Sequence, residues 1–259
     1  YFLEHFSSTS ELGIFSLGFK IASILSVLLL QPFQVAWPAI FYPQAREANA
    51  NIIFSKFTTY FLLIGGTAGL ILILIAKPMI TIIGTPEYIR AYIIVPILVF
   101  SMIIGQGGLQ SIISSGLFLK RKTKYAPIII IIGALCNITL NWLLIPSWGM
   151  MGAAIATLIS SLIMVVVAYV LSLNIYKIEL EFMRIYKLIS VLVILSAIDA
   201  FINISNMYLI LVMKLMLLMS LPTLLMILKF FNDEEIRYIK YIISITNVRQ
   251  IWKRDDFKI

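Results

Sequence analysis

The chain is poor in cysteine, in histidine and in charged residues. It has one cysteine, Cys136, so neither a disulfide within the chain nor a cysteine-based metal site can form. Its one histidine, His5, cannot by itself supply a histidine metal site. Charged residues make up 12% of the 259 residues, whereas a soluble domain carries about 25%. These shortages exclude a disulfide scaffold and argue against a zinc protein or an ordinary soluble enzyme.

Sequence motifs for chemistry are missing as well. We find no glycine-rich phosphate loop ahead of a helical pattern and no nucleophile paired with a base. A self-contained ATPase or covalent enzyme is therefore disfavoured, and we predict no cofactor and no metal. The net charge of +8 lies in loops and at the C-terminal end, without the interleaved aromatic residues of a nucleic-acid surface. We therefore expect no nucleic-acid partner.

Apolar residues dominate instead, at 61% of the sequence, and the mean hydropathy is +1.02. A helix needs about 20 mainly apolar residues to cross a bilayer, and backbone groups in lipid must be satisfied within a helix. Seven stretches approach this length: 13–37, 54–76, 91–119, 125–145, 151–173, 187–204 and 208–230. The sequence therefore predicts an all-α, polytopic bundle of about seven transmembrane helices.

Positive charges alternate between the gaps that separate these stretches. On the opposite side, the gap at 77–90 holds only Lys77 and Arg90, and the gap at 146–150 holds none. Sixteen of the twenty Lys and Arg residues fall on the other side: Arg46, Lys56, Lys120, Arg121, Lys122, Lys124, Lys177, Arg184, Lys187, Lys229, Arg237, Lys240, Arg249, Lys253, Arg254 and Lys258. Because cationic loops stay in the cytoplasm, we expect a cytoplasmic C-terminus and an extracytoplasmic residue 1. A chain that begins outside is expected to follow an earlier span, so we interpret it as the C-terminal part of a longer protein.

Three ionisable residues lie inside the predicted spans, where they are costly and hence functional candidates. Lys20 faces either a water-filled cavity or, by snorkelling, the outer interface. Asp199 and Lys214 lie on the last two spans, which are antiparallel and joined by a short turn. Their positions predict a structural ion pair.

Uncharged polar residues also fall inside the spans, among them Gln34, Asn137 and Asn141. Asn137 and Asn141 are four residues apart, so they share one helix face. Their amides can either hold helices together or bind sugar hydroxyls. After the last span, residues 231–259 alternate apolar and charged side chains, which is typical of an amphipathic helix on the inner leaflet or of a partly disordered tail.

Three stretches resemble the polysaccharide-biosynthesis flippases of the multidrug/oligosaccharidyl-lipid/polysaccharide (MOP) superfamily. SELGIFSL at 10–17, followed by Lys20 and by QVAWP at 34–38, is similar to the family's "ELGIYSLAYKI … QAWxP", with Phe15 in place of the usual tyrosine. GLFLKRKTK at 116–124 is similar to its glycine-then-basic loop. NITLNWLLIP at 137–146, with the GMMGAA and AT that follow, resembles "NLxLNxxLIPxxGxxGAAxAT" and is the most specific of the three.

This resemblance implies a fold, a substrate and a location. Residues 1–175 would form the C-terminal lobe of the transporter, 187–230 two additional spans, and 231–259 a cytoplasmic tail. The implied activity is flipping of undecaprenyl-diphosphate-linked oligosaccharide units for O-antigen, capsule or exopolysaccharide, by alternating access, in the bacterial cytoplasmic (inner) membrane. The implied partners are membrane lipids, the N-terminal lobe of the same protein and the polysaccharide polymerase machinery. Lys20, Gln34, Asn137 and Asn141 would contact the substrate.

Other interpretations stay open. A multidrug or cation antiporter of the same superfamily would need acidic cation-coupling residues, and Asp199 is the one acid inside a predicted span. A scaffold of a polysaccharide assembly complex that does not itself transport is also compatible with the sequence. A membrane-embedded polymerase or glycosyltransferase would need a longer loop with clustered acids or arginines than any predicted gap provides.

Overall fold

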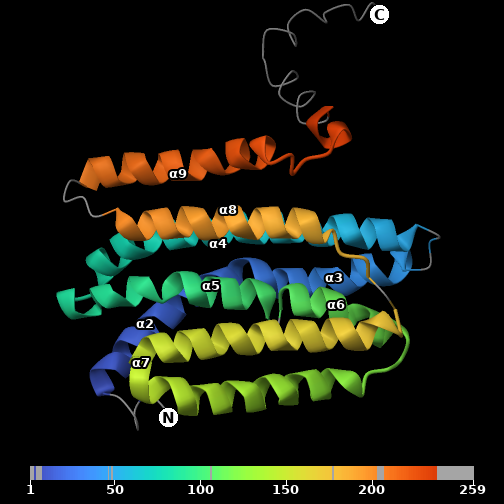
Figure 1. The fold of residues 1–259 in the computed structure, drawn as a ribbon, viewed down its shortest axis with the longest axis horizontal. Helices are drawn as coiled ribbons and strands as arrows, with labels where there is room; N and C mark the ends of the chain where they lie inside the picture. Colours follow the sequence, from blue (N-terminus) through green and yellow to red (C-terminus); the bar gives the residue numbers. More distant parts are fainter. Residues whose placement is uncertain are drawn as a thin grey trace, which may run out of the picture.

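The computed structural model describes residues 3, 8–45, 47, 49–105, 107–176, 178–202 and 207–237, and no strand occurs among them. The helices, numbered as in Figure 1, follow the predicted apolar stretches. They are α2 (Thr9–Leu25), the π-helical segment η1 (Ser26–Leu30), α3 (Gln31–Gln44), α4 (Ala50–Ile83), the 3₁₀ segment η2 (Pro86–Ile93), α5 (Val95–Ile104), α6 (Leu109–Leu119), α7 (Tyr125–Leu173), α8 (Phe182–Phe201) and α9 (Met207–Ile227). The all-helical prediction is confirmed for the described residues. The predicted tail falls mostly at 238–259, outside them.

Within the described ranges, five helical stretches are long and apolar enough to cross a membrane. They are Thr9–Gln44, Ala50–Ile82, Val95–Leu119, Tyr125–Leu173 and Tyr208–Ile227. Helix α8 has 20 residues but also carries Arg184, Lys187 and Asp199, which lowers its apolar character. The length and hydropathy of the five stretches indicate a membrane protein.

Helix α7 is two helices joined at a sharp bend. Gly149 has φ 52° and ψ −131°, which is non-helical backbone that favours glycine. Figure 1 shows the chain folding back on itself there, so that 125–148 and 150–173 run as the two arms of a hairpin. The two arms correspond to the predicted stretches 125–145 and 151–173.

The predicted stretch 91–119 is also interrupted. It consists of the end of η2, then α5 and α6, which are separated at 105–108 by backbone in which Gly107 has φ 100°. Together α4, α5 and α6 form the buried centre of the molecule, whereas much of α7 and α9 is exposed. Leu98 of α5 and Ile112 of α6 are completely buried. The outer helices thus present apolar faces, as expected where lipid takes the place of water.

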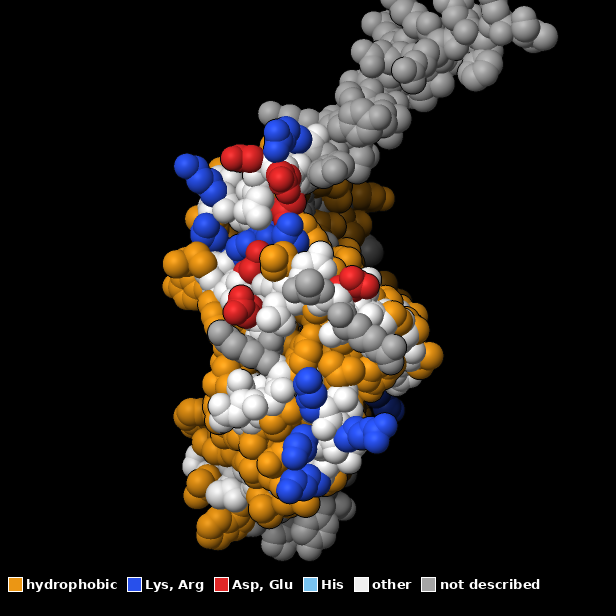
Figure 2. Space-filling view, turned by 90° about the vertical axis from the view of Figure 1, so that its right-hand side faces the viewer, with side chains coloured by type: hydrophobic (Ala, Val, Ile, Leu, Met, Phe, Trp, Pro, Cys, Tyr) orange, Lys and Arg blue, Asp and Glu red, His pale blue; other side chains and the backbone are white. Residues whose placement is uncertain are grey.

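The elongated helices lie roughly alongside one another, so the connections gather at two ends (Figure 1). The start of α4, the end of α6, both ends of α7 and the start of α8 meet at one end. Figure 2 shows Lys and Arg side chains over this end, among extensive apolar surface. We call it the basic end; it includes the exposed loop at 120–124.

Candidate functional site

A groove of about 360 Å³ lies between α2 and α7. Its walls are mainly apolar, but four polar residues reach it: two from the first arm of α7, one from the second arm and one from α2. The lining residues are Leu3, Leu12, Phe15, Ser16, Phe19, Asn137, Asn141, Ile145, Ala153 and Thr157. We call this hollow the α2–α7 groove.

The asparagine pair forms the polar part of the groove in the first arm of α7. Asn141 Nδ2 donates a hydrogen bond to Asn137 Oδ1 over 2.9 Å, as their spacing of four residues allows. Asn141 Oδ1 is buried and accepts no hydrogen bond. Asn137 lies twelve residues after Tyr125, which places it about 18 Å along the arm, near its middle. An unsatisfied acceptor at this depth is costly unless a ligand or water supplies the donor.

A hydroxyl group suits this arrangement, because it can both donate and accept hydrogen bonds. It can donate to Asn141 Oδ1, which has no partner, and accept from an amide N–H of the same pair. On the second arm, the Thr157 hydroxyl already donates to Ala153 O over 2.8 Å, which leaves its oxygen lone pairs to accept. The groove therefore offers both hydrogen-bonding roles to a polyhydroxylated ligand.

Glu11 of α2 holds the bend of α7 beside the groove. Its Oε2 accepts a hydrogen bond from Met150 N–H over 2.9 Å, at the first residue after the bend. The carboxylate also lies against the Cα of Gly149, where a Cβ would collide with it. A carboxylate at a helix N-terminus is favoured both as a cap and by the helix dipole. Two of the sequence stretches singled out above, around 11 and around 149, therefore meet in space, and neither stretch alone predicts the contact.

The other two predicted substrate residues lie outside the groove lining. Lys20 is exposed on α2, one turn after Ser16, which does line the groove. Gln34 of α3 places its amide against Gly107, at the break between α5 and α6. The structure thus brings Asn137 and Asn141 together, keeps Lys20 nearby and places Gln34 in a different contact.

Asp199 and Lys214 form an ion pair between α8 and α9. Lys214 Nζ lies 2.8 Å from Asp199 Oδ1, and the lysine is 7% exposed. The ammonium group also donates to the backbone oxygen of Leu74 in α4 over 2.5 Å. The additional contact with α4 is invisible in the sequence, because it depends on how three helices pack.

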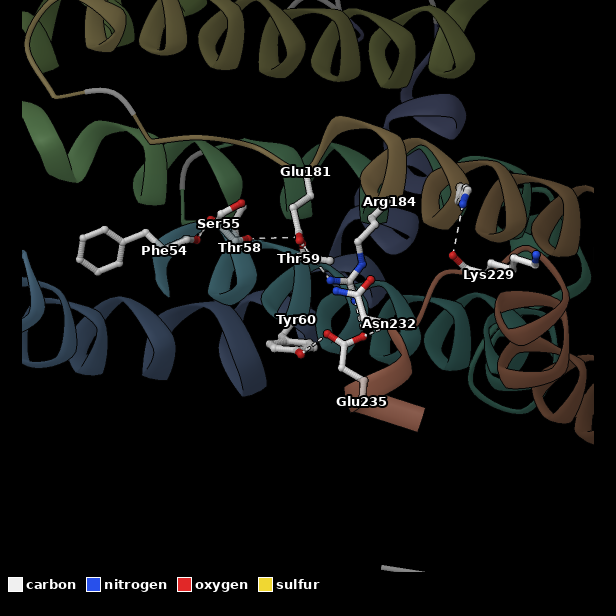
Figure 3. Close-up of polar contacts among 11 residues, drawn as sticks. Phe54, Ser55, Thr58, Thr59, Tyr60, Glu181, Arg184, Lys229, Asn232 and Glu235 are labelled. Carbon is white, nitrogen blue, oxygen red and sulfur yellow. Dashed lines mark hydrogen bonds and ion pairs between the residues drawn. The ribbon is translucent and has the colours of Figure 1, made fainter. Parts of the chain in front are cut away.

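A polar cluster at the basic end was not foreseen as a site, since Arg184 looks in the sequence like one more charge of a cationic loop. Figure 3 shows Arg184 between two carboxylates, and its nitrogens lie 3.0 Å from Glu181 Oε2 and 2.8 Å from Glu235 Oε2. Thr59 donates to Glu181 over 2.6 Å and Tyr60 donates to Glu235, both from α4. We call these five residues the Arg184 cluster. It fastens the segment after α9 to the starts of α4 and α8.

Glu235 is ionised more readily than an ordinary glutamate. Burial raises its pKa, but hydrogen bonds from Tyr60, from the Asn232 N–H and from Arg184 outweigh burial, so the pKa is lowered. Asn232 N–H donates to Glu235 Oε2 over 2.8 Å. These contacts hold chain segments together.

No group of three or more His, Cys, Asp or Glu side chains that could hold a metal ion occurs in the described part of the chain. Comparison with known protein families, with curated proteins and with solved structures finds no match for this chain.

Proposed function

We propose that this chain forms one lobe of a membrane flippase that translocates undecaprenyl-diphosphate-linked oligosaccharide units. The observation that carries the proposal is the α2–α7 groove, where the Asn137–Asn141 pair offers hydrogen bonds midway along a helix apolar enough to span a membrane. Lipid cannot satisfy these amides, so a groove of this kind is expected to face water or a polar ligand. Sugar hydroxyl groups provide the required donors and acceptors.

The resemblance to the polysaccharide flippases supplies the substrate class. Of the three similar stretches, the first and third both contribute to the groove, through Ser16 and through Asn137, Asn141 and Thr157. Lys20, one turn from Ser16, would add a positive charge for the diphosphate at the edge of the groove. The proposal thus places sugar at the asparagines and phosphate near the lysine.

The proposed topology has seven spans, with the two arms of α7 counted separately and α8 included. Helix α8 can cross because Asp199 is neutralised by Lys214 and Arg184 lies at the end of the helix. The bias of Lys and Arg toward the basic end makes this end cytoplasmic. The membrane would be the bacterial cytoplasmic membrane, and a preceding lobe of the same protein would close the substrate cavity.

A cation-coupled multidrug antiporter is less well supported. Such a protein needs an acidic residue that is free to exchange cations within the membrane. Asp199 lies 2.8 Å from Lys214 and is almost buried, so it already has a positive partner.

Complementation tests the proposal. The gene for this protein should restore surface polysaccharide to a strain that lacks its flippase. Asn141→Leu and Asn137→Leu should each reduce the restored polysaccharide at least tenfold while membrane abundance stays normal. Thr139→Val is the matched control, because Thr139 is exposed on the same arm and its hydroxyl bonds only to Leu135 O of its own helix. Normal polysaccharide from both asparagine variants would contradict the role of the groove.

A further inference from the structure

A second hollow, of about 250 Å³, lies between α8 and the centre of the molecule. Apolar side chains and one glycine of α4, α5, α6, α7 and α8 line all of it. In Figure 1, α5 runs between α8 and the second arm of α7. These two helices form the two sides of the hollow. Helix α8 packs mainly on α4 and α9, and this leaves the hollow on the side that faces α7. We call it the lateral crevice.

The crevice has a buried floor and an exposed rim. Leu62, Ile103 and Leu192 on the floor are at most 5% exposed. On the rim, Leu162 is 44%, Ile189 38% and Val193 48% exposed. The crevice therefore opens sideways, across the faces of the helices, rather than at an end of the bundle.

Water is a poor occupant of such a space, because an apolar cavity offers it no hydrogen-bond partners. The four helices that line the crevice together with α8, namely α4, α5, α6 and α7, all lie in stretches apolar enough to span a membrane. At this depth a sideways opening faces hydrocarbon rather than water. The volume fits on the order of eight methylene groups if each is taken as similar in size to a water molecule, roughly 30 Å³.

The position of the crevice along α8 connects it to the basic end. Its α8 lining begins at Leu188, six residues after the helix start at Phe182, which is about 9 Å along the axis. Lys and Arg side chains gather at this end (Figure 2), and a phosphate group is attracted to them. A lipid with its phosphate at the basic end would thus place an acyl chain at the depth of the crevice.

We infer that the lateral crevice binds one acyl chain of a membrane phospholipid drawn from the leaflet at the basic end. This inference depends on the chain spanning a membrane and not on what it transports. The lipid would fill the gap between α8 and α7 and so hold α8 against the other helices. Relative to bulk lipid, the acyl chain gains only from closer packing in the crevice.

The test uses the full chain in nanodiscs that contain phosphatidylglycerol with a diazirine at the middle of one acyl chain. After illumination, adducts are mapped by peptide mass spectrometry. We expect adducts on the floor residues Leu62 and Ile103. Leu162→Trp and Ile189→Trp, made separately, should each lower the floor adducts at least threefold by filling the entrance.

The matched controls are Ile131→Trp and Met216→Trp, at apolar residues that are 56% and 64% exposed and lie outside the crevice. They should leave the floor adducts unchanged. Adducts confined to exposed residues would overturn the inference, and so would floor adducts that both rim variants leave unchanged. A polyprenyl phosphate that carries the same diazirine provides the second arm. Preferential labelling of the floor by that probe, at equal mole fraction, would show that a carrier lipid and not a phospholipid is the occupant.

Discussion

At the scale of single residues, this molecule depends on a few polar groups set in apolar helices. Glu11 and Gly149 are an example, since the carboxylate caps the second arm of α7 and the glycine permits the bend. The carboxylate can reach the cap only because residue 149 is a glycine, since a side chain at 149 would collide with it. The pair therefore fixes how the two arms sit against α2, and with them the α2–α7 groove.

We predict that Gly149→Ala and Glu11→Ala both destabilise the chain. Alanine at φ 52° and ψ −131° is strained by about 1–3 kcal/mol, and loss of a cap costs about 1 kcal/mol. The midpoint of thermal unfolding in detergent should fall by several degrees for each variant. Ser147→Ala, at an exposed neighbour, is the control and should not change it. An unchanged midpoint for Gly149→Ala would show that the bend is not held in this conformation.

At the scale of helices, polar contacts attach the α8–α9 pair to the rest of the bundle. Lys214 of α9 reaches both Asp199 of α8 and the backbone of α4 at Leu74. At the other end of the pair, the Arg184 cluster joins α8 and the segment after α9 to α4. The additional helices are thus fastened to α4 at both ends.

We predict that Asp199→Asn and Lys214→Met each lower the amount of folded protein, and that the double variant loses less than the sum. A single change leaves one charge without its partner in a span, at a cost of about 3 kcal/mol on insertion scales. The measurement is a double-mutant cycle on the folded fraction in membranes. Strictly additive losses would mean that the two side chains do not interact.

Acid should loosen the Arg184 cluster. The pKa of Glu235 is lower in the folded chain than in an unfolded one, so its contribution to stability is complete at neutral pH. That contribution is lost as pH falls below the ordinary glutamate value of about 4.3 and through the lowered folded value. Hydrogen exchange of the peptide around Asn232, corrected for intrinsic rates, should quicken at least threefold in this range.

Glu235→Gln should produce the same increase at neutral pH, because it removes the charge that Arg184 and the Asn232 N–H bind. Glu234→Gln, at the exposed neighbouring position, is its control. Equal exchange in the two variants would exclude a role of Glu235 in holding this segment.

At the scale of the whole molecule, hydropathy and charge predicted the all-helical membrane character. Low charge and long apolar stretches indicate a membrane protein, and a chain that crosses a bilayer in such stretches must be helical to satisfy its own backbone. The separation of Asn137 and Asn141 by four residues was enough to place them on one face, and the antiparallel course of α8 and α9 was enough to suggest the Asp199–Lys214 contact. The Glu11–Met150 contact and the Arg184 cluster join residues more than 50 positions apart. They follow from packing, which periodicity does not encode.

Topology gives the prediction at this scale. In a Cys136→Ser background, Ser147→Cys beside the α7 bend should react with an impermeant maleimide in intact cells. Thr123→Cys in the exposed loop at the basic end should react only after permeabilisation. The reverse pattern would invert the proposed orientation and place the basic end outside, against the charge bias.

The most direct measurement asks whether the lipid-linked oligosaccharide reaches the outer face of the cytoplasmic membrane. Spheroplasts with a radiolabelled oligosaccharide would be treated with an impermeant endoglycosidase, with and without this gene. We predict that the label is released with the wild-type gene and is protected without it or with Asn141→Leu. Equal release in the absence of the gene would contradict the proposal that this protein flips the oligosaccharide.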